Sequence, residues 1–403
     1  MRWAWAPLFL ALCCSGPGCG GEPAREPGAE GPVSVSEEDF SPNVILISLD
    51  TFRADRLAKA PFISELGNRG WRSTQFWSNS NWTLPAHVSL LTSSPPIEHD
   101  VPGVGSQLPY LDERIPEELT TLAEAFQSAG YFTAATTDGG FLIPRFGLER
   151  GFDQFRAEES GEGGDSFLRH QQSLEEVLAR RGGQPFFLFV HSYEIHDYFL
   201  NTAPYHRFVD PQADREAGAH GSWLEEIKKG TAPADYVSRL YDSGIRWVDG
   251  FVEELVTRAE AATPGEDLLV VITSDHGESF GDRPGLWHHG QGLWEEQLRV
   301  PLVVWGNFEA APKGRSDTPA SLMDLAPSVL AASGVPIPPS FNGRASLFAT
   351  SGDVLRPDSV SPGATIEAGR ISSGSSLKSG FLSAALIEDG WKYSRRDSLD
   401  GRL

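Results

Sequence analysis

Short apolar runs recur along the chain, with room for a helix between most of them. Five runs suit buried strands, and they cover residues 43–50, 131–138, 184–191, 267–275 and 299–305. Apolar runs without regular polar alternation are typical of parallel strands that are buried on both faces. The spacing therefore predicts a parallel sheet inside the protein.

Two stretches between these runs have helical patterns. Residues 116–130 read PEELTTLAEAFQSAG and stop at a glycine. Residues 235–259 repeat apolar positions on one helical face, at Leu240, Val248, Phe251, Val252 and Leu255. Alternating strands and helices predict an α/β fold, in which a large, mostly parallel sheet is sandwiched by helices. Ligands of such sheets bind beyond the carboxyl ends of the strands.

The last part of the chain has a different pattern. Residues 373–380 read SGSSLKSG, which is typical of a loop. Residues 384–396 read AALIEDGWKYSRR, which predicts a hairpin around Asp389 and Gly390. We therefore expect residues 348–403 to form a small C-terminal antiparallel subdomain.

The N-terminal stretch MRWAWAPLFLALCCSGPGCGG predicts an export signal over residues 1–19. Its apolar run is too short to span a bilayer as a helix. A cysteine after that run resembles a bacterial lipoprotein signal, so we expect an exported protein, either periplasmic or anchored to the membrane by an N-terminal lipid. Residues 20–41 are rich in Gly, Pro and Glu, which predicts a flexible tether.

The composition restricts the chemistry and the partners. The three cysteines, Cys13, Cys14 and Cys19, all lie in the predicted signal, which excludes disulfides and thiol catalysis from the rest of the chain. Lys and Arg total 33 against 55 Asp and Glu, which gives a formal charge of −22. This charge argues against nucleic acid or an anionic membrane face as the main partner. Solubility alone would also account for it.

Three residues at predicted strand ends could hold a metal. Asp50 ends the run 43–50, Asp275 ends the run 267–275, and His276 follows. Carboxylate oxygens with an imidazole nitrogen form a ligand set that zinc and manganese use. Each residue alone has an ordinary alternative, because an aspartate after a strand often caps a helix and DHG can form a turn.

A threonine stands at the start of a predicted short helix in TLPAHVSLLTSSPP, residues 83–96. Thr83 can serve as the helix cap, since Pro85 suits a first turn. It can instead be a nucleophile, because a helix N-terminus offers free N–H groups and a partial positive charge to an anionic centre. The local sequence leaves both interpretations open.

Six blocks along residues 43–347 resemble, in order, the motifs of the sulfatase branch of the alkaline phosphatase superfamily. They read NVILISLDTFRADRL, TLPAHVSLLTSSPP, PFFLFVHSYEIHDYF, VITSDHGESFGD, HHGQGLWEEQLRVPLVV and SLMDLAPSVLAASGVPIPPSFNGRASL. Six ordered blocks are far more specific than one motif. The resemblance implies a catalytic domain over residues 42–347. Because relatives usually continue past the WKY strand, it also implies that the subdomain 348–403 is truncated.

The chain departs from typical sulfatases in a consistent way. Their nucleophile is a Cys or Ser that is oxidised to formylglycine, with an Arg four residues later. Here Thr83 takes the first place and His87 the second, and threonine cannot become formylglycine. Thr51 stands in place of a second metal-binding Asp, DGGFLI replaces a lysine-any-histidine pair, and His289 stands in place of a sulfate-binding lysine.

These departures resemble the phospho-transfer branches of the same superfamily, which include nucleotide phosphodiesterases and phosphoglycerol and phosphoethanolamine transferases. Their nucleophile is an unmodified threonine. The resemblance implies that Asp50, Thr83, Asp275 and His276 bind a divalent metal, with zinc or manganese ranked first and calcium next. A bound divalent cation can lower the pKa of a coordinated water from about 16 to about 7, and a coordinated threonine hydroxyl gains similarly.

Three histidines complete the candidate catalytic set with Thr83. His196 aligns with a substrate-contacting histidine of the family, His289 with the histidine of an HG block, and His87 with the arginine named above. His196 or His289 could donate a hydrogen bond to the ester oxyanion, protonate the leaving group or complete a second metal site. The weaker candidates are His191, His288 and Glu194.

The sequence thus predicts a metal-dependent hydrolase or transferase that forms a covalent intermediate on Thr83. Phosphodiesters or phosphonates are the first candidate substrates and sulfate esters the second, as esters of small molecules, glycans or lipids. The alternative is a catalytically silent surface lipoprotein that binds a metal or a glycan. The retention of all four metal-ligand positions favours the enzyme.

Overall fold

The computed structural model describes residues 40–101, 114–157, 166–200, 203–217, 222–290, 292–348, 364–372, 380–388 and 391–398. The predicted export signal lies outside the described residues, as does the predicted tether except for its last two positions. The turn at Asp389 and Gly390 and nearly all of the SGSSLKSG stretch also lie outside them.

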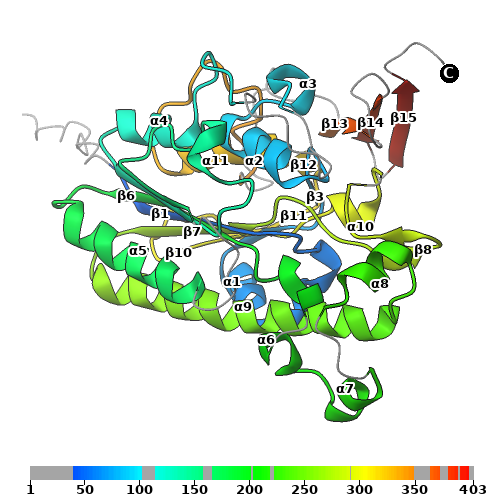
Figure 1. Ribbon diagram of the computed structural model, residues 1–403. Helices are drawn as coiled ribbons and strands as arrows, with labels where there is room; N and C mark the ends of the chain where they lie inside the picture. The colour runs from blue at the N-terminus through cyan, green and yellow to red at the C-terminus, as the bar shows by residue number, and fades with distance from the viewer. Residues whose placement is uncertain are drawn as a thin grey trace, which may run out of the picture. The chain divides into compact units, whose positions relative to one another are not determined.

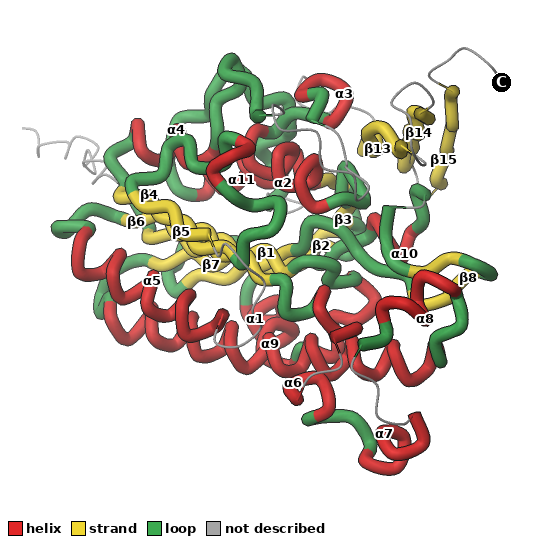
Figure 2. The backbone as a smooth tube through the Cα atoms, in the orientation of Figure 1, coloured by secondary structure: helices red, strands yellow, loops and turns green. Residues whose placement is uncertain are grey.

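An eight-stranded sheet forms the centre of the described fold (Figures 1 and 2). Its strand order is β11 (Gly314–Ser316), β2 (Trp71–Ser73), β10 (Leu302–Gly306), β7 (Leu268–Thr273), β1 (Asn43–Leu49), β6 (Phe186–Ser192), β4 (Phe132–Thr137) and β5 (Gln154–Ala157). The strands from β7 to β5 form one parallel block. The mostly parallel sheet is therefore confirmed.

One predicted parallel strand runs the other way. The run 299–305 forms β10, which pairs antiparallel with both β7 and β2. Every residue of this strand but the last is buried. A strand covered on both faces is apolar whichever direction it takes, so the pattern could not reveal the direction.

The core lies on both sides of the sheet because successive residues of a strand point to opposite faces. In β1, Ile45 and Ile47 join one hydrophobic cluster, whereas Val44 and Leu46 join the other. All seven residues of this strand are buried. This explains why the run has no polar alternation.

Helices cover both faces of the sheet. Figure 1 shows α1 (Pro61–Arg69), α5 (Ser166–Arg180) and α9 (Ala234–Ala262) on one side, and α2 (Thr83–Thr92), α4 (Leu122–Ser128) and α11 (Leu325–Ala332) on the other. The long predicted helix is confirmed as α9. The helix predicted over residues 116–130 is shorter, because a capping box between Thr121 and Glu124 starts α4 there.

Shorter elements connect these layers. The helices are α3 (Pro96–His99), α6 (Ala203–His206), α7 (Pro211–Ala217), α8 (Leu224–Lys229) and α10 (Glu295–Leu298), with 3₁₀ helices η1 (Ala54–Lys59), η2 (Pro144–Phe146), η3 (His196–Leu200) and η4 (Leu322–Asp324). The strand pairs are β3 (Phe76–Trp77) with β12 (Ala320–Ser321) and β8 (Phe280–Arg283) with β9 (Leu286–Trp287). Within the described residues, no helix is both long enough and apolar enough to cross a membrane.

The C-terminal residues form a separate three-stranded antiparallel sheet. Its order is β13 (Ala364–Ser372), β14 (Gly380–Glu388) and β15 (Trp391–Ser398). Strands β14 and β15 pair from Glu388 with Trp391 outward, as the predicted hairpin requires. The small antiparallel subdomain is therefore confirmed, with β13 as a third strand that the sequence pattern did not indicate.

Candidate active site

Two aspartates meet at the carboxyl ends of neighbouring strands. Asp50 follows β1 and Asp275 comes two residues after β7, and these strands are paired in parallel. Both side chains are fully buried, as is His276. One ligand atom from each of the three residues lies within 4.8 Å of the others. The predicted metal ligands are therefore brought together by the strand pairing itself.

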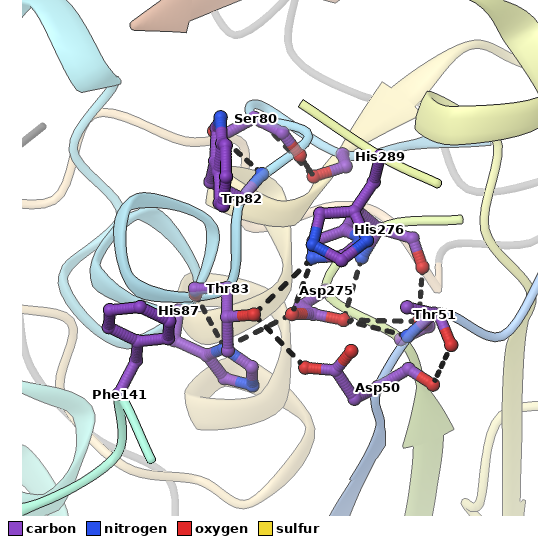
Figure 3. Close-up of polar contacts among 12 residues, drawn as sticks. Asp50, Thr51, Ser80, Trp82, Thr83, His87, Phe141, Asp275, His276 and His289 are labelled. Carbon is purple, nitrogen blue, oxygen red and sulfur yellow. Dashed lines mark hydrogen bonds and ion pairs between the residues drawn. The ribbon is translucent and has the colours of Figure 1, made fainter. Parts of the chain in front are cut away.

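Thr83 points into the same site from the start of α2 (Figure 3). Its Oγ1 donates to Asp50 Oδ2 over 3.2 Å and lies 3.4 Å from His276 Nε2. The N-cap position belongs to Trp82, whose side chain makes no capping hydrogen bond. The cap interpretation of Thr83 is therefore wrong, because its hydroxyl is directed toward the strand ends.

The donor atoms around Thr83 fit a divalent cation. Asp50 Oδ1 and Asp275 Oδ2 are buried without a hydrogen-bond partner, which is costly for a carboxylate unless a cation balances it. His276 Nδ1 hydrogen-bonds to the Gly277 carbonyl over 2.9 Å, which leaves Nε2 as the ligand atom. Two carboxylates, an imidazole and a hydroxyl suit zinc or manganese, and the oxygens also suit calcium.

The two carboxylates have opposite electrostatic environments. Burial and the neighbouring Asp275 raise the pKa of Asp50 well above its usual range. Burial alone would raise the pKa of Asp275 too, but His276, His87 and His191 outweigh it and lower that pKa. Without a cation, these surroundings favour protonation of Asp50 over protonation of Asp275. A divalent cation between the two carboxylates would remove the repulsion that holds this proton.

A second group of histidines packs beside the first. The rings of His289 and His276 lie tilted to each other with centroids 4.4 Å apart, and the centroids of His288 and His289 are 4.2 Å apart. Burial lowers the pKa of His288 to about 3 and also lowers the pKa of His289 well below its usual value. Burial also acts to lower the pKa of His196, but its hydrogen bond to Asp197 prevails and raises it.

The chain resembles known proteins over most of its length. Residues 42–335 match the sequence profile of the Sulfatase family. The chain belongs to the sulfatase family. This sulfatase-family chain is 24% identical to an ulvan-active sulfatase of Formosa agariphila over 77% of its own length and 65% of the relative's. It is also 24% identical to human arylsulfatase A, over 74% of its own length and 65% of the relative's.

The chain thus spans about two thirds of the length of these curated relatives. Among solved structures, a phosphonate monoester hydrolase of Agrobacterium radiobacter superimposes with a TM-score of 0.65 at 18% identity, covering 89% of this chain and 88% of the other. At 18% identity, this superposition shows a shared fold alone. The predicted sulfatase-like architecture is therefore confirmed.

His87 of this sulfatase-family chain is held on both sides of its ring. Its Nδ1 donates to the Thr83 carbonyl over 2.8 Å, and its Nε2 accepts from Ser48 Oγ over 2.9 Å. Burial lowers its pKa. Nδ1 also lies 3.6 Å from Asp275 Oδ2. This arrangement fixes the first turn of α2 against β1 and suits His87 for positioning Thr83.

Two polar residues of the site were not among the candidates. Glu278 is fully buried, and its Oε2 lies 3.4 Å from His289 Nδ1. Tyr193 follows β6, and its hydroxyl accepts a hydrogen bond from the Phe141 amide over 3.3 Å. Burial and the charge of Asp50 raise the pKa of Tyr193, so it stays protonated. Both residues come a few positions after a predicted strand, and this placement is the feature of the sequence that could have identified them.

The structure explains why a threonine can stand at position 51. It adopts a left-handed backbone with φ of 61°, and its hydroxyl donates to the Asp50 carbonyl over 2.7 Å. Its amide donates to Asp275 Oδ1 over 3.3 Å. Thr51 therefore orients a candidate ligand through its backbone instead of supplying a carboxylate.

Proposed function

We propose that this protein is a metal-dependent ester hydrolase or transferase that uses Thr83 as a covalent nucleophile. The observation that supports this most directly is the position of Thr83 Oγ1, within reach of Asp50 Oδ2 and His276 Nε2. The hydroxyl also lies at the N-terminal end of the ten-residue helix α2, where the helix dipole favours negative charge. Both features suit an oxygen that attacks an anionic ester.

Asp50, Thr83, Asp275 and His276 would hold the cation. When bound, it would favour the deprotonated Thr83 oxygen and screen the negative charge of the ester. Zinc or manganese fits the mixed oxygen and nitrogen donors best, and calcium is the third candidate. His87 holds the first turn of α2 so that Thr83 faces the two aspartates.

In the reaction, Thr83 Oγ1 forms a bond to phosphorus while the bond from phosphorus to the leaving oxygen breaks. The leaving oxygen takes up a proton and departs, and the Thr83 ester is then cleaved by water or an acceptor alcohol. Tyr193 and the histidines next to His276 are the groups nearby that could contact the ester oxygens. Preorganised donors of this kind stabilise the charge that develops in the transition state.

Phosphodiesters and phosphonates are the substrates we rank first. The chain has no cysteine beyond residue 19, and a threonine stands at the nucleophile position, so formylglycine chemistry has no precursor there. Sulfate esters rank second, because the curated relatives include an ulvan-active sulfatase and an arylsulfatase. A silent binding protein ranks third, since it gives no reason for a hydroxyl directed at two buried carboxylates.

Replacing Thr83 tests the proposal. We expect Thr83→Ala to lower kcat by about 10⁴-fold or more, because a covalent nucleophile is lost, and to leave the fold and most of the bound metal intact. Thr83→Ser keeps the hydroxyl and should retain measurable turnover. The assay uses chromogenic sulfate, phosphomonoester, phosphodiester and phosphonate esters with one preparation of each protein. A folded, metal-loaded Thr83→Ala variant with wild-type turnover would exclude the proposal.

A further inference from the structure

Tyr193 lies between the two strand ends that carry Asp50 and Asp138. It follows β6, which pairs in parallel with β1 on one side and with β4 on the other. The Tyr193 side chain is partly exposed, whereas the side chains of Asp50 and Thr83 are buried. A hydroxyl at this point can therefore contact a molecule that enters the site.

Hydrogen bonds hold the backbone of Tyr193 in place. Its amide donates to Asp138 Oδ2 over 2.9 Å, and its carbonyl accepts from the Asp197 amide over 3.0 Å. The preceding residue is also fixed, because the Ser192 carbonyl accepts from the Asp50 amide over 3.0 Å. Tyr193 is thus tied to the strand ends on both sides of it, as a precisely placed functional group requires.

Two imidazole rings pack against the phenol ring of Tyr193. His191 meets it edge-on with ring centroids 4.6 Å apart, and His196 does so with centroids 5.4 Å apart. Edge-to-face contacts between rings favour a defined geometry. The phenol is therefore held in one orientation by the side chains around it, as well as by its backbone.

The turn after β4 leaves the space that the phenol occupies. Gly139 and Gly140 both have a left-handed backbone, with φ of 76° and 61°. A Cβ at Gly140 would lie 2.8 Å from the Tyr193 hydroxyl oxygen and 2.8 Å from a carbon of its ring, which is too close for any other residue. Glycine is therefore required at position 140 by its φ and by the phenol.

The same turn also supplies a hydrogen-bond donor to the phenol oxygen. The Phe141 amide donates to the Tyr193 hydroxyl over 3.3 Å. The hydroxyl also interacts with the side chain of Thr83 and with the charges of Asp50 and Asp275. A tyrosine hydroxyl that accepts a backbone N–H keeps its own O–H to donate. Because the Thr83 hydroxyl donates to Asp50 Oδ2, the Tyr193 O–H is a donor that remains available beside the nucleophile.

Two histidines next to Thr83 donate to backbone carbonyls instead. His87 Nδ1 donates to the Thr83 carbonyl over 2.8 Å. His276 Nδ1 donates to the Gly277 carbonyl over 2.9 Å. Neither N–H is therefore available to an oxygen of a group bonded to Thr83, whereas the O–H of Tyr193 is.

We propose that the Tyr193 hydroxyl donates a hydrogen bond to a non-bridging oxygen of the anionic group that is transferred to Thr83 Oγ1. The proton stays on Tyr193 throughout, so no covalent bond to this residue forms or breaks. The hydrogen bond strengthens as negative charge develops on that oxygen, so it lowers the barrier more than it tightens substrate binding. The inference rests on the proposed function, because it assigns a donor to the group that Thr83 attacks.

Tyr193→Phe tests the inference on the full-length chain loaded with zinc chloride, and Tyr131→Phe is its matched control. Tyr131 is buried and directly precedes β4, so it lies at the opposite edge of the sheet from Thr83. We expect Tyr193→Phe to lower kcat by about 10²–10³-fold, as the loss of one oxyanion donor does, with little change in KM. Bound zinc and Tm should stay at the wild-type values, and the control should keep the wild-type kcat.

Orthovanadate distinguishes a catalytic donor from a structural residue. It can bind an attacking oxygen as a five-coordinate oxyanion, so it resembles the transition state of the transfer. Calorimetric titration of the zinc-loaded proteins gives its Kd without any need for turnover. Tyr193→Phe should weaken orthovanadate binding by about the factor that it removes from kcat/KM, whereas binding of inorganic phosphate should weaken much less.

Gly140→Ala displaces the phenol without removing its hydroxyl. We expect kcat to fall, and we expect the double variant with Tyr193→Phe to lose no more activity than Tyr193→Phe alone, because the two changes remove the same contact. Gly130→Ala is the control for backbone strain. Gly130 also has a left-handed φ, of 86°, but a Cβ there would meet nothing within 4 Å, so kcat should stay at the wild-type value.

Three results would overturn the inference. The first is a kcat and an orthovanadate Kd in Tyr193→Phe that equal those of Tyr131→Phe. The second is a higher KM with unchanged kcat, which would mean that the contact is made equally in the ground state and the transition state. The third is loss of bound zinc in Tyr193→Phe, which would indicate a structural role.

Thr83→Ala shows which of the two proposals has failed. If Thr83→Ala is inactive while Tyr193→Phe is fully active, the covalent nucleophile stands and the Tyr193 donor is wrong. If a folded, zinc-loaded Thr83→Ala variant is fully active, the proposed function is wrong and this inference fails with it.

Discussion

Three aspartates follow parallel strands of the same sheet, yet their surroundings differ. Asp138 follows β4, and its Oδ2 accepts hydrogen bonds from Ser192 Oγ and the Tyr193 amide, each 2.9 Å away. Its Oδ1 lies 3.2 Å from His170 Nε2. One carboxylate oxygen of each aspartate lacks a hydrogen-bond partner, namely Asp50 Oδ1, Asp138 Oδ1 and Asp275 Oδ2. Asp138 Oδ1, however, lies 3.5 Å from Arg169 Nη2, whereas the ion-pair partners of Asp50 and Asp275 among the described residues are histidines.

The pKa values follow these surroundings. Burial opposes ionisation of Asp138, but the hydrogen bond and charge of His170 outweigh it and lower the pKa. Burial and a second carboxylate raise the pKa of Asp50. Arg169 and His170 therefore balance the charge of Asp138, whereas a bound cation would balance the pair Asp50 and Asp275. An aspartate at a strand end is thus a candidate metal ligand here when a second carboxylate lies beside it, and not when cationic side chains balance its charge.

The largest expected difference concerns metal binding. Asp275→Asn should remove one equivalent of bound metal and weaken that site by more than the about 10–100-fold of outer-shell changes, because a direct ligand is lost. Asp138→Asn should bind metal as the wild type does. Elemental analysis of the two variants side by side measures this. Equal metal content in Asp275→Asn and wild type would refute the assignment.

The free energy of unfolding should instead depend on Asp138. Asp138→Asn should lower the free energy of unfolding by about 3 kcal/mol, because it removes the anion beside Arg169 and the buried His170. Urea unfolding of the metal-free proteins measures this. Glu253→Gln, at an exposed position on α9, is the matched control and should change little. A loss in Asp138→Asn no larger than in the control would contradict the assignment.

Asp50→Asn should have the reverse effect on the metal-free protein. The neutral amide removes the repulsion from Asp275 and still accepts the Thr83 hydrogen bond, so we expect a gain of about 1–2 kcal/mol. The same urea experiment, in the presence of chelator, measures the change. A loss similar to that of Asp138→Asn would show that the two sites are alike and would remove the basis for the comparison.

The smallest effect is the pH dependence of the Asp138 network. Its pKa lies below the ordinary 3.8 in the folded protein, so the unfolded chain takes up the proton first as pH falls. The stabilisation is complete above about pH 5 and is lost progressively below about pH 4. The difference in stability between wild type and Asp138→Asn should therefore be constant from pH 5 to 7 and shrink toward pH 3. A difference that grows on acidification would contradict this sign.

Much of the fold could be predicted because it depends on local pattern. Continuous apolar runs gave β1, β6 and β7, and helical periodicity gave α9. Burial on both faces leaves a direct trace in the sequence, since no polar residue can occupy either face. The direction of β10 left no such trace, because a buried strand is apolar in either direction.

The candidate site was predicted in part. Asp50, Asp275 and His276 could be singled out because the ends of parallel strands meet at one edge of a sheet. The role of Thr83 could not be settled locally, since a cap and a nucleophile use the same hydroxyl at the start of a helix. Its partner Asp50 comes from a strand 33 residues earlier in the chain, and only packing of α2 on the sheet brings the two together.

The sequence by itself thus determined which segments are buried and which residues of ligating chemistry end them. Tertiary structure alone decided which of those residues face each other. It left Asp50 Oδ1 and Asp275 Oδ2 without hydrogen-bond partners, placed Asp138 beside Arg169 and His170, and gathered His196, His288 and His289 at one point. The physical reason is that burial and periodicity are recorded in neighbouring residues, whereas the charge and hydrogen bonding of a site depend on contacts between segments far apart in the chain.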